Sequence, residues 1–525
     1  MSETGVRKTV GGSGGAVHDG GAGALIQPLD EHNRRLLANV HPQPYANPRP
    51  KERYHLVVLG AGTGGLVTAA IGAALGAKVA LVERHLAGGD CLNVGCVPSK
   101  ALLRAARAWS EARRAAREFG GPAAAGPGDF GVVMERMRRL RADLSRNDSV
   151  ARFTGLGVDV FIGEGRFTGP DALVVNGATT LRFRRAVVAT GGRPAVPSVP
   201  GLREIEPLTN ETVFGLTTLP ARLVVIGAGP IGCELAQAFA RFGSRVTVVN
   251  RGERILPKED ADAARIVEEA LRRDGVRFLL GSRLIGARRD GGVRTLLFEH
   301  QGKHIEEQAE EILVAAGRAP NVESAGLGAA GIAFDDKGVR VNARLRTTNR
   351  RVYAVGDVSS RFQFTHAADA QARLVAQNAL FFGRGRADRL VMPWCTYTSP
   401  ELAHVGLSEA EARARGLAVD TLTVSLEEVD RAVLDGATEG FARVHLEQGG
   451  DRILGATIVA EHAGDLIGEI TLAMTAKTGL GAIGSTIHPY PTQGEVLRKL
   501  ADAWRRRKLT PQARRAFGVF FRVFK

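Results

Sequence analysis

Two cysteines with four residues between them, Cys91 and Cys96, are the side chains best suited to do chemistry in this sequence. Such a pair can close to a disulfide and open again to a dithiol, which transfers two electrons. We expect both thiols on one helical turn, near a helix start whose positive end would lower a thiol pKa. The spacing alone also fits two small buried residues, so the surrounding sequence decides between these interpretations.

The sequence before the cysteines predicts a nucleotide-binding unit. The apolar run His55–Leu59 suits a buried parallel strand, and it leads directly into the pattern G-x-G-x-x-G. Gly60 makes the tight turn, Gly62 lets the backbone approach a pyrophosphate, and Gly65 allows close packing of a helix on the strand. A second strand is followed by Glu83, placed to accept hydrogen bonds from ribose hydroxyls.

The same pattern occurs again further along the chain. The strand Leu223–Ile226 leads into Gly227, Gly229 and Gly232, and the strand Arg245–Val249 follows at the same spacing. Two fingerprints in one chain predict two bound dinucleotides, one in each unit.

The cysteine run at 88–100 and the two glycine patterns resemble the class I pyridine nucleotide-disulfide oxidoreductases, which include mercuric reductase, dihydrolipoamide dehydrogenase and glutathione reductase. In that family FAD binds to the first unit and NAD(P)H to the second. The resemblance extends to Thr190 and Gly191 in an Ala-Thr-Gly strand end, to Gly317 in a Gly-Arg-Ala-Pro-Asn crossover, and to Asp357 in the Gly-Asp pair that binds the ribityl chain of the flavin.

The resemblance implies an α/β fold with two Rossmann-like dinucleotide-binding domains, in which the NAD(P) domain is inserted into a split FAD domain, and a C-terminal α+β dimerisation domain. The expected parts are a flexible N-terminal extension (1–52), the first part of the FAD domain with the redox disulfide (53–200), the NAD(P) domain (201–320), the second part of the FAD domain (321–390), the dimerisation domain (391–500) and a basic tail (501–525). The first 20 or so residues are expected to be disordered, whereas residues 29–40 suit a short helix packed on the body.

The resemblance also assigns roles in the reaction. Hydride from NAD(P)H reduces the flavin, and Cys96 is implied to be the thiol beside the flavin, with a thiolate that gives a charge-transfer band. Cys91 is implied to be the interchange thiol that meets the substrate. Lys100 and Glu234 match a buried ion pair beside the flavin ring. Asp90 stands where the family usually has Thr, and its charge should disfavour the Cys91 thiolate.

Cofactor selectivity is decided where the second strand of the second unit ends. NAD-selective members have an acidic residue there, whereas this chain has Asn250, Arg251 and, one turn on, Arg254. These cations favour the 2′-phosphate of NADPH. Gly232 argues the other way, because NADP-selective glutathione reductases usually have Ala at its position. We expect NADPH to be preferred.

A C-terminal loop departs from the family pattern. Dihydrolipoamide dehydrogenase and glutathione reductase read His-Pro-Thr-x-x-Glu, with the His as acid/base for the thiols. Aligning Glu495 with that Glu places Tyr490 at the His position and His488 two residues earlier. Tyr, with a pKa near 10, is a poor base at neutral pH. Mercuric reductases have Tyr here as a substrate ligand, but this sequence lacks their C-terminal Cys pair, so we expect poor handling of Hg(II).

Three functions stay open. The favoured one is an FAD-dependent NAD(P)H:disulfide oxidoreductase, mercuric reductase-like, that acts on a small disulfide or a thiol-bound metal. The others are a dihydrolipoamide dehydrogenase with His488 as base, and a membrane-associated flavin electron-transfer protein with a protein or quinone acceptor. A homodimer is implied, because in the family the loop bearing Tyr490 and Glu495 completes the site of the partner subunit.

Composition agrees with an enzyme of this kind. The chain has 525 residues, 44% of them hydrophobic, and four cysteines, which favours a reducing cytoplasm and a catalytic disulfide. The net charge of +15 comes without a nucleic-acid-binding motif, so we expect a solvated basic surface, no nucleic-acid partner and no metal site. The basic tail carries Phe517, Phe520, Phe521 and Phe524 on one helix face, which fits either docking on the dimer body or contact with an anionic membrane.

Overall fold

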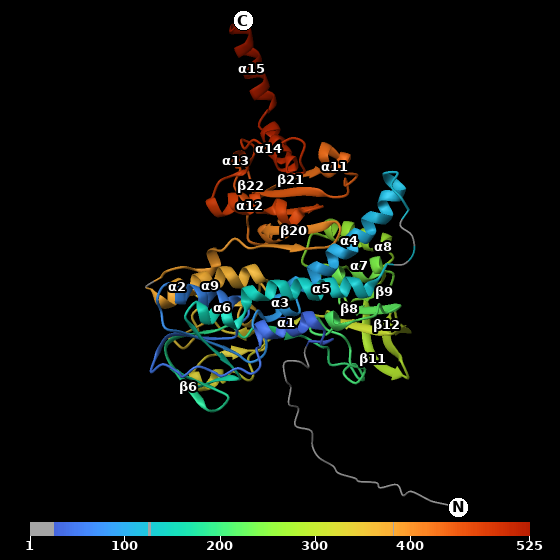
Figure 1. Cartoon of the computed structure of the whole chain (residues 1–525). Helices are drawn as coiled ribbons and strands as arrows, with labels where there is room; N and C mark the ends of the chain where they lie inside the picture. Colours follow the sequence, from blue (N-terminus) through green and yellow to red (C-terminus); the bar gives the residue numbers. More distant parts are fainter. Residues whose placement is uncertain (1–25, 124–125, 127, 382, 525) are drawn as a thin grey trace, which may run out of the picture.

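The computed structural model describes residues 26–123, 126, 128–381 and 383–524 (Figure 1). The predicted disorder of the first 20 or so residues lies outside this part of the chain. Three main sheets with packed helices form the body, and the helix α15 (Pro511–Val523) extends from one end of it. Among the described residues, no helix is both long and apolar enough to cross a membrane.

The first sheet joins two parts of the chain that are far apart in sequence. Its strands run in the order β3-β2-β1-β6-β5-β4, and β18 pairs with β6. Their bounds are β1 (Tyr54–Leu59), β2 (Val79–Glu83), β3 (Val158–Ile162), β4 (Gly165–Gly169), β5 (Ala172–Val175), β6 (Thr179–Val188) and β18 (Val352–Ala354). Because β18 returns to this sheet only after the whole second unit, the first domain is split, as predicted from the sequence.

Helices cover one face of the first sheet. Its parallel strands are buried on both faces, which explains why their sequences are continuous apolar runs. The helices of this domain are α1 (Glu31–Val40), α2 (Thr63–Ala74), α3 (Gly89–Asn93), α4 (Cys96–Glu118), α5 (Phe130–Ser145), α6 (Val150–Gly155) and α9 (Thr365–Leu380). The opposite face packs against the meander of β4 and β5 and against the segment around 322–339.

The second sheet is parallel, with strand order β10-β9-β8-β14. Its elements are β8 (Arg222–Ile226), α7 (Pro230–Phe242), β9 (Arg245–Val249), α8 (Ala261–Arg273), β10 (Arg277–Leu279) and β14 (Glu311–Val314). An antiparallel sheet of β11 (Ser282–Asp290), β12 (Val293–His300) and β13 (Lys303–Ala309) covers one face of this parallel sheet.

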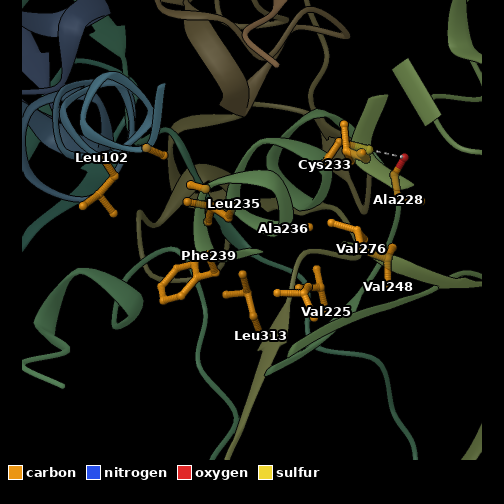
Figure 2. Packing of buried hydrophobic residues seen from close by; sticks show 14 of the residues in the cluster. Leu102, Val225, Ala228, Cys233, Leu235, Ala236, Phe239, Val248, Val276 and Leu313 are labelled. Carbon is orange, nitrogen blue, oxygen red and sulfur yellow. Dashed lines mark hydrogen bonds between the residues drawn. The ribbon is translucent and has the colours of Figure 1, made fainter. Parts of the chain in front are cut away.

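The core of this second unit also binds the helix that carries Cys96. Figure 2 shows Val225 of β8 and Leu313 of β14 packed against Phe239 of α7, with Leu102 of α4 in the same cluster. Cys233 lies in this core as well, fully buried in α7. Helix α4 therefore packs into the second unit while its first turn belongs to the first, and this places the dithiol between the two nucleotide-binding folds.

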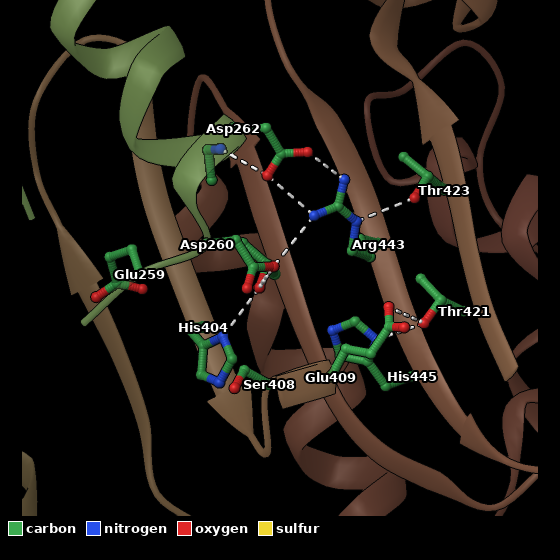
Figure 3. Close-up of polar contacts among 12 residues, drawn as sticks. Glu259, Asp260, Asp262, His404, Ser408, Glu409, Thr421, Thr423, Arg443 and His445 are labelled. Atoms are coloured by element: carbon green, nitrogen blue, oxygen red, sulfur yellow. Dashed lines mark hydrogen bonds and ion pairs between the residues drawn. The ribbon is translucent and has the colours of Figure 1, made fainter. Parts of the chain in front are cut away.

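The third sheet is antiparallel, with strand order β19-β20-β23-β22-β21. Its elements are β19 (Pro393–Thr396), β20 (Glu401–Gly406), α10 (Glu409–Ala414), β21 (Val419–Ser425), α11 (Asp430–Leu434), β22 (Phe441–Glu447), β23 (Ile453–Ala460), α12 (Ala463–Ala476), α13 (Leu480–Ile483) and α14 (Glu495–Arg507). Arg443 of β22 binds Asp260 at 3.1 Å and also Asp262 in the first turn of α8 (Figure 3). This ion pair, which lowers the pKa of Asp262, fixes the third sheet on the second unit.

Two expectations about the ends of the chain need correction. Residues 26–52 are not a flexible extension: the predicted helix forms as α1, with Leu36 and Val40 fully buried against the first domain. The pairing of Arg138 with Asp30 ties the start of α1 to α5. The predicted boundary between 500 and 501 falls inside α14, where Ala501 is fully buried.

Candidate active site

One large cavity, about 2090 Å³, lies where the three main sheets meet. Small-molecule pockets are usually ~300–1,000 Å³, so this cavity suits ligands as large as dinucleotides. It brings together most of the residues predicted from the sequence: Gly60, Gly62, Glu83, Cys91, Cys96, Lys100, Thr190, Gly191, Gly227, Gly229, Glu234, Asn250, Arg251, Gly317 and Asp357.

The first glycine cradle has the geometry that the sequence predicts. Gly60 has a φ of +102°, and a Cβ there would overlap the backbone oxygen of Ala189. A Cβ on Gly65 would overlap the backbone oxygen of Gly60, so the helix α2 can approach β1 this closely only with glycine. Helix α2 begins at Thr63, directly after the cradle, and its N-terminus is a natural site for a phosphate.

Glu83 lies at the end of β2 beside this cradle. Its carboxylate accepts hydrogen bonds from the backbone N–H of Ala61 at 2.6 Å and of His85 at 2.8 Å, which fix it on the cavity wall. Burial raises the pKa of Glu83. A carboxylate held here fits the ribose of a dinucleotide.

The second cradle repeats the first. Gly227 has a φ of +111°, and a Cβ on Gly232 would overlap the backbone oxygen of Gly227. Helix α7 starts at Pro230, right after this turn. Two helix N-termini, each behind a glycine turn on the wall of one cavity, fit the pyrophosphates of two dinucleotides.

The two arginines after β9 have different surroundings. The guanidinium of Arg254 donates to the backbone oxygens of Pro257 at 2.6 Å and Glu259 at 2.8 Å, so it holds its own loop. Arg251 is exposed at the cavity wall next to Asn250. Of the two cations expected to favour a 2′-phosphate, Arg251 is the one with a suitable position.

The thiols do not share one helical turn, which corrects the sequence prediction. Cys91 lies in the short helix α3, and Cys96 is the first residue of the long helix α4. Gly95 separates the two helices, and a Cβ there would come within 2.8 Å of the backbone oxygen of Asp90. The positive end of the long helix is therefore next to Cys96, not Cys91. All four cysteines of the chain are free thiols in this structure.

The surroundings of the two thiols make them unequal. A hydrogen bond from the Cys91 thiol lowers the pKa of Cys96, although partial burial opposes this effect. The hydroxyl of Thr365, 3.3 Å from the Cys96 sulfur, and the charge of Lys100 lower it further. The same hydrogen bond, together with burial, raises the pKa of Cys91. In the dithiol state the negative charge therefore resides on Cys96 and the proton on Cys91.

Lys100 and Glu234 form the predicted ion pair, with 2.8 Å between Nζ and Oε2. The other oxygen of Glu234 accepts a hydrogen bond from the backbone N–H of Tyr397 at 2.9 Å. The Lys100 ammonium lies 4.5 Å from the centre of the Tyr397 ring. Three elements, α4, α7 and the end of β19, thus meet at this one charged pair.

The contacts of Arg318 were not predicted from the sequence. Its guanidinium binds the carboxylate of Asp90 and reaches Asp357 at 3.1 Å. The charge of Asp90 is therefore compensated in part by Arg318, and Asp148 is a second carboxylate that helps to raise the pKa of Cys91. The expected effect of Asp90 on Cys91 stays a prediction. The Gly-Arg-Ala-Pro-Asn motif contained the signal, but only its glycine was singled out.

The C-terminal loop lies away from the cavity of its own chain. Tyr490 is 69% exposed, and its hydroxyl donates to Asp430 at 2.9 Å, which raises the pKa of Tyr490. Ile487, on the same loop, is 95% exposed. Such exposure of large side chains is typical of a surface that another chain covers.

His488, in the loop, and Glu495, the first residue of α14, are each engaged with a different partner. The Nε2 atom of His488 lies 3.0 Å from Glu469, and the His488 side chain is only 9% exposed. Glu495 is buried and pairs with Arg498 at 2.7 Å. The sequence analysis did not find Glu469, because that residue lies on α12, outside the loop motif.

A dithiol between two dinucleotide cradles defines the class of the protein, a flavin- and nicotinamide-dependent disulfide oxidoreductase. Residues 54–372 match the family described as pyridine nucleotide-disulphide oxidoreductase, and residues 392–501 match the dimerisation domain of that family. The chain belongs to this family and is an oxidoreductase that uses FAD and NAD(P)H. The match to a dimerisation domain supports a homodimer.

The relatives include enzymes with different acceptors. The chain is 36% identical over 458 residues to a mercuric reductase of Streptomyces lividans, covering 86% of this chain and 96% of the relative. It is 33% identical over 470 residues to a dihydrolipoyl dehydrogenase of Bacillus subtilis, covering 86% and 98%. A solved structure, the HOCl-induced flavoprotein disulfide reductase RclA from Escherichia coli, matches with a TM-score of 0.76 at 26% identity, covering 86% and 99%.

Proposed function

We propose that this oxidoreductase uses NADPH to reduce a small disulfide or a thiol-bound soft metal ion at the pair Cys91 and Cys96. The observation that carries the proposal is the position of Cys91 and Cys96 on the wall of the cavity between the two glycine cradles, with Cys96 at the start of α4 and its sulfur 3.3 Å from the Thr365 hydroxyl. When bound, FAD supplies two-electron transfer between the nicotinamide and a disulfide.

The arrangement supports a balanced exchange with a disulfide R–S–S–R. Cys91 passes its proton to the Cys96 thiolate and attacks one sulfur, so that the acceptor bond breaks and one thiolate leaves. That thiolate takes the proton from Cys96. The Cys96 thiolate then attacks the Cys91 sulfur, the second thiolate leaves, and the Cys91–Cys96 disulfide forms. Two electrons have then passed from the pair to the acceptor.

The loop favours the mercuric reductase-like form of this function over dihydrolipoamide dehydrogenase. In a homodimer, the exposed Tyr490 could exchange its contact with the exposed Asp430 for one at the site of the partner subunit, where its hydroxyl can bind a metal thiolate or a polar acceptor. His488, the base in the alternative, is engaged with Glu469 and largely buried. A phenol close to a dithiol can bind a substrate but shuttles protons poorly at neutral pH.

Two further parts of the proposal rest on single features. NADPH is favoured over NADH because Arg251 is exposed at the cavity wall after β9, where an acidic residue would select NADH. A cytoplasmic location is favoured by the low number of cysteines, since four in 525 residues do not form a framework of structural disulfides.

An anaerobic titration of the flavin-loaded enzyme tests the proposal. NADPH should reduce it faster than NADH and give a long-wavelength absorbance band, which Cys91→Ser should keep and Cys96→Ser should abolish. Lipoamide, glutathione disulfide and a mercuric dithiol complex are then compared as oxidants, and the fastest identifies the acceptor class. Full turnover in Cys91→Ser would contradict the proposal and favour electron transfer to a protein or quinone.

A further inference from the structure

We propose that the C-terminal helix α15 attaches this protein to an anionic lipid surface. Helix α15 spans Pro511–Val523 and has no buried residue. In Figure 1 it extends from the end of the body, beyond α14. It also follows the last residue of the family match at 501, so it is an addition to the catalytic and dimerisation domains.

The helix is amphipathic, with its apolar face made of aromatic rings. Phe517, Phe520, Phe521 and Phe524 are 52%, 51%, 65% and 71% exposed. At 3.6 residues per turn they fall within an arc of about 100°. Phe520 contacts both Phe521 and Phe524, with ring centres 5.6 Å and 4.5 Å apart. A joined, exposed aromatic face of this kind fits the boundary between lipid headgroups and acyl chains.

Basic residues flank and oppose the aromatic face. Arg514 lies at its edge beside Phe521, whereas Arg515 and Arg522 lie on the opposite side together with Val519, and no Asp or Glu occurs between 503 and 524. The last turn of the preceding helix, α14, carries Arg505, Arg506 and Arg507, and Lys508 follows it. Arginines at the edges of an aromatic face can stay in the headgroup layer and pair with anionic phosphates.

Charge also argues for lipid over a second copy of the chain as the occupant. Helix α15 contains three arginines and no acidic residue, in a chain with a formal net charge of +15, so like charges oppose the pairing of two copies of this helix. An anionic bilayer has the complementary charge. With 13 residues the helix is only about 20 Å long, shorter than the ~30 Å of a bilayer core, so it would lie in the interface and not span it.

Co-sedimentation of the full-length flavin-loaded enzyme with vesicles tests this proposal. Binding should be strong to phosphatidylcholine mixed with phosphatidylglycerol and weak to phosphatidylcholine alone, and it should weaken in high salt. The variant F520S/F521S/F524S and the variant R514E/R515E should each reduce binding to the anionic vesicles by about tenfold or more.

Matched controls change the same kinds of residue elsewhere. Phe119→Ser removes another exposed Phe, and R182E/R184E reverses two exposed arginines on β6; both should bind as the natural protein does. NADPH oxidation should be equal in all variants in the absence of vesicles. Equal vesicle binding by F520S/F521S/F524S overturns the proposal. If the same variant also loses dimer mass in light scattering, the occupant of the face is a second copy.

Discussion

The guanidinium of Arg318 binds the carboxylate of Asp90, the residue directly before Cys91, across 228 positions of sequence. The same guanidinium reaches Asp357 at 3.1 Å and the backbone oxygen of Gly192 at 3.0 Å. Arg318 thus fixes the start of α3, the redox helix that carries Cys91, to the turn that follows β18. The side chains of Arg318 and Asp357 are 14% and 19% exposed, so the pair between them lies in largely desolvated surroundings.

Replacing Arg318 should therefore destabilise the enzyme. Arg318→Met leaves the two carboxylates of Asp90 and Asp357 facing each other, and we expect a loss of about 3 kcal/mol in the free energy of unfolding. Asp90→Asn should cost about 1 kcal/mol or less, because Asp90 is 40% exposed and its pair is partly screened. Urea unfolding with an unchanged m-value measures both losses.

The control for this prediction is an exposed arginine in a similar pair. Arg283 binds Glu299 on the surface with 66% of its side chain exposed, so Arg283→Met should change stability by less than about 0.5 kcal/mol. If Arg318→Met is as stable as Arg283→Met, Arg318 does not hold the redox helix in place.

Lys100 and Glu234 should shift the pKa of Cys96 in opposite directions. The positive charge of Lys100 stabilises the thiolate, so Lys100→Met should raise the pKa of Cys96. The negative charge of Glu234 disfavours the thiolate, so Glu234→Gln should lower it. In a profile of iodoacetamide alkylation against pH, resolved for each cysteine by mass spectrometry, the midpoint moves up in the first variant and down in the second.

Arg104 provides the matched control for that experiment. It lies one turn further along α4 and is 58% exposed, so Arg104→Met should leave the Cys96 midpoint where it is. Movement of both Lys100→Met and Glu234→Gln in the same direction would show that changes of structure, not charge, control the thiol.

Local patterns predicted the parts of the site that local geometry determines. Gly60, Gly65, Gly227 and Gly232 have the backbone geometry expected from their spacing, because a tight turn and a close helix restrict the residue type at each position. The arrangement of the thiols could not be read in the same way. Gly95 breaks the helix, and no apolar periodicity marks such a break in a short run between two cysteines.

Contacts between distant segments also could not be predicted from the sequence. The segment 26–52 is rich in Pro and polar residues, which favoured a flexible extension. In the structure the buried Arg141 of α5 donates to Asn33 of α1 at 2.8 Å and to the backbone oxygen of Asn93 at 2.6 Å. This bridge from α1 to the redox helix depends on two polar residues on separate helices, and composition contains no information about it.

The C-terminal loop gives a separate test of the acceptor chemistry. Tyr490→Phe removes a hydroxyl whose one hydrogen bond, to Asp430, is exposed to solvent, so stability should stay within about 0.5 kcal/mol while kcat/KM for the acceptor falls about tenfold. Reduction of the flavin by NADPH should be unchanged, because the loop lies outside the cavity lining of its own chain. Stopped-flow and steady-state kinetics separate the two steps.

His488→Ala, in contrast to Tyr490→Phe, should lower the stability of the protein. Loss of the contact with Glu469 should cost about 1–3 kcal/mol in stability, since the His488 side chain is only 9% exposed. Glu469→Gln keeps a hydrogen-bonding group and should therefore lose less stability than His488→Ala. If lipoamide turnover disappears in His488→Ala and survives in Tyr490→Phe, the dihydrolipoamide dehydrogenase alternative is correct.

The two arginines after β9 should separate cofactor binding from loop stability. A charge-assisted hydrogen bond to a phosphate contributes about 1.5–3 kcal/mol, so Arg251→Ala should lower kcat/KM for NADPH by roughly 10- to 100-fold. The value for NADH should change less than about threefold, because NADH has no 2′-phosphate. Arg254→Ala is the control: it frees the backbone oxygens of Pro257 and Glu259, so both cofactors should be affected to the same extent. An equal loss with both cofactors in Arg251→Ala would contradict the proposed preference for NADPH.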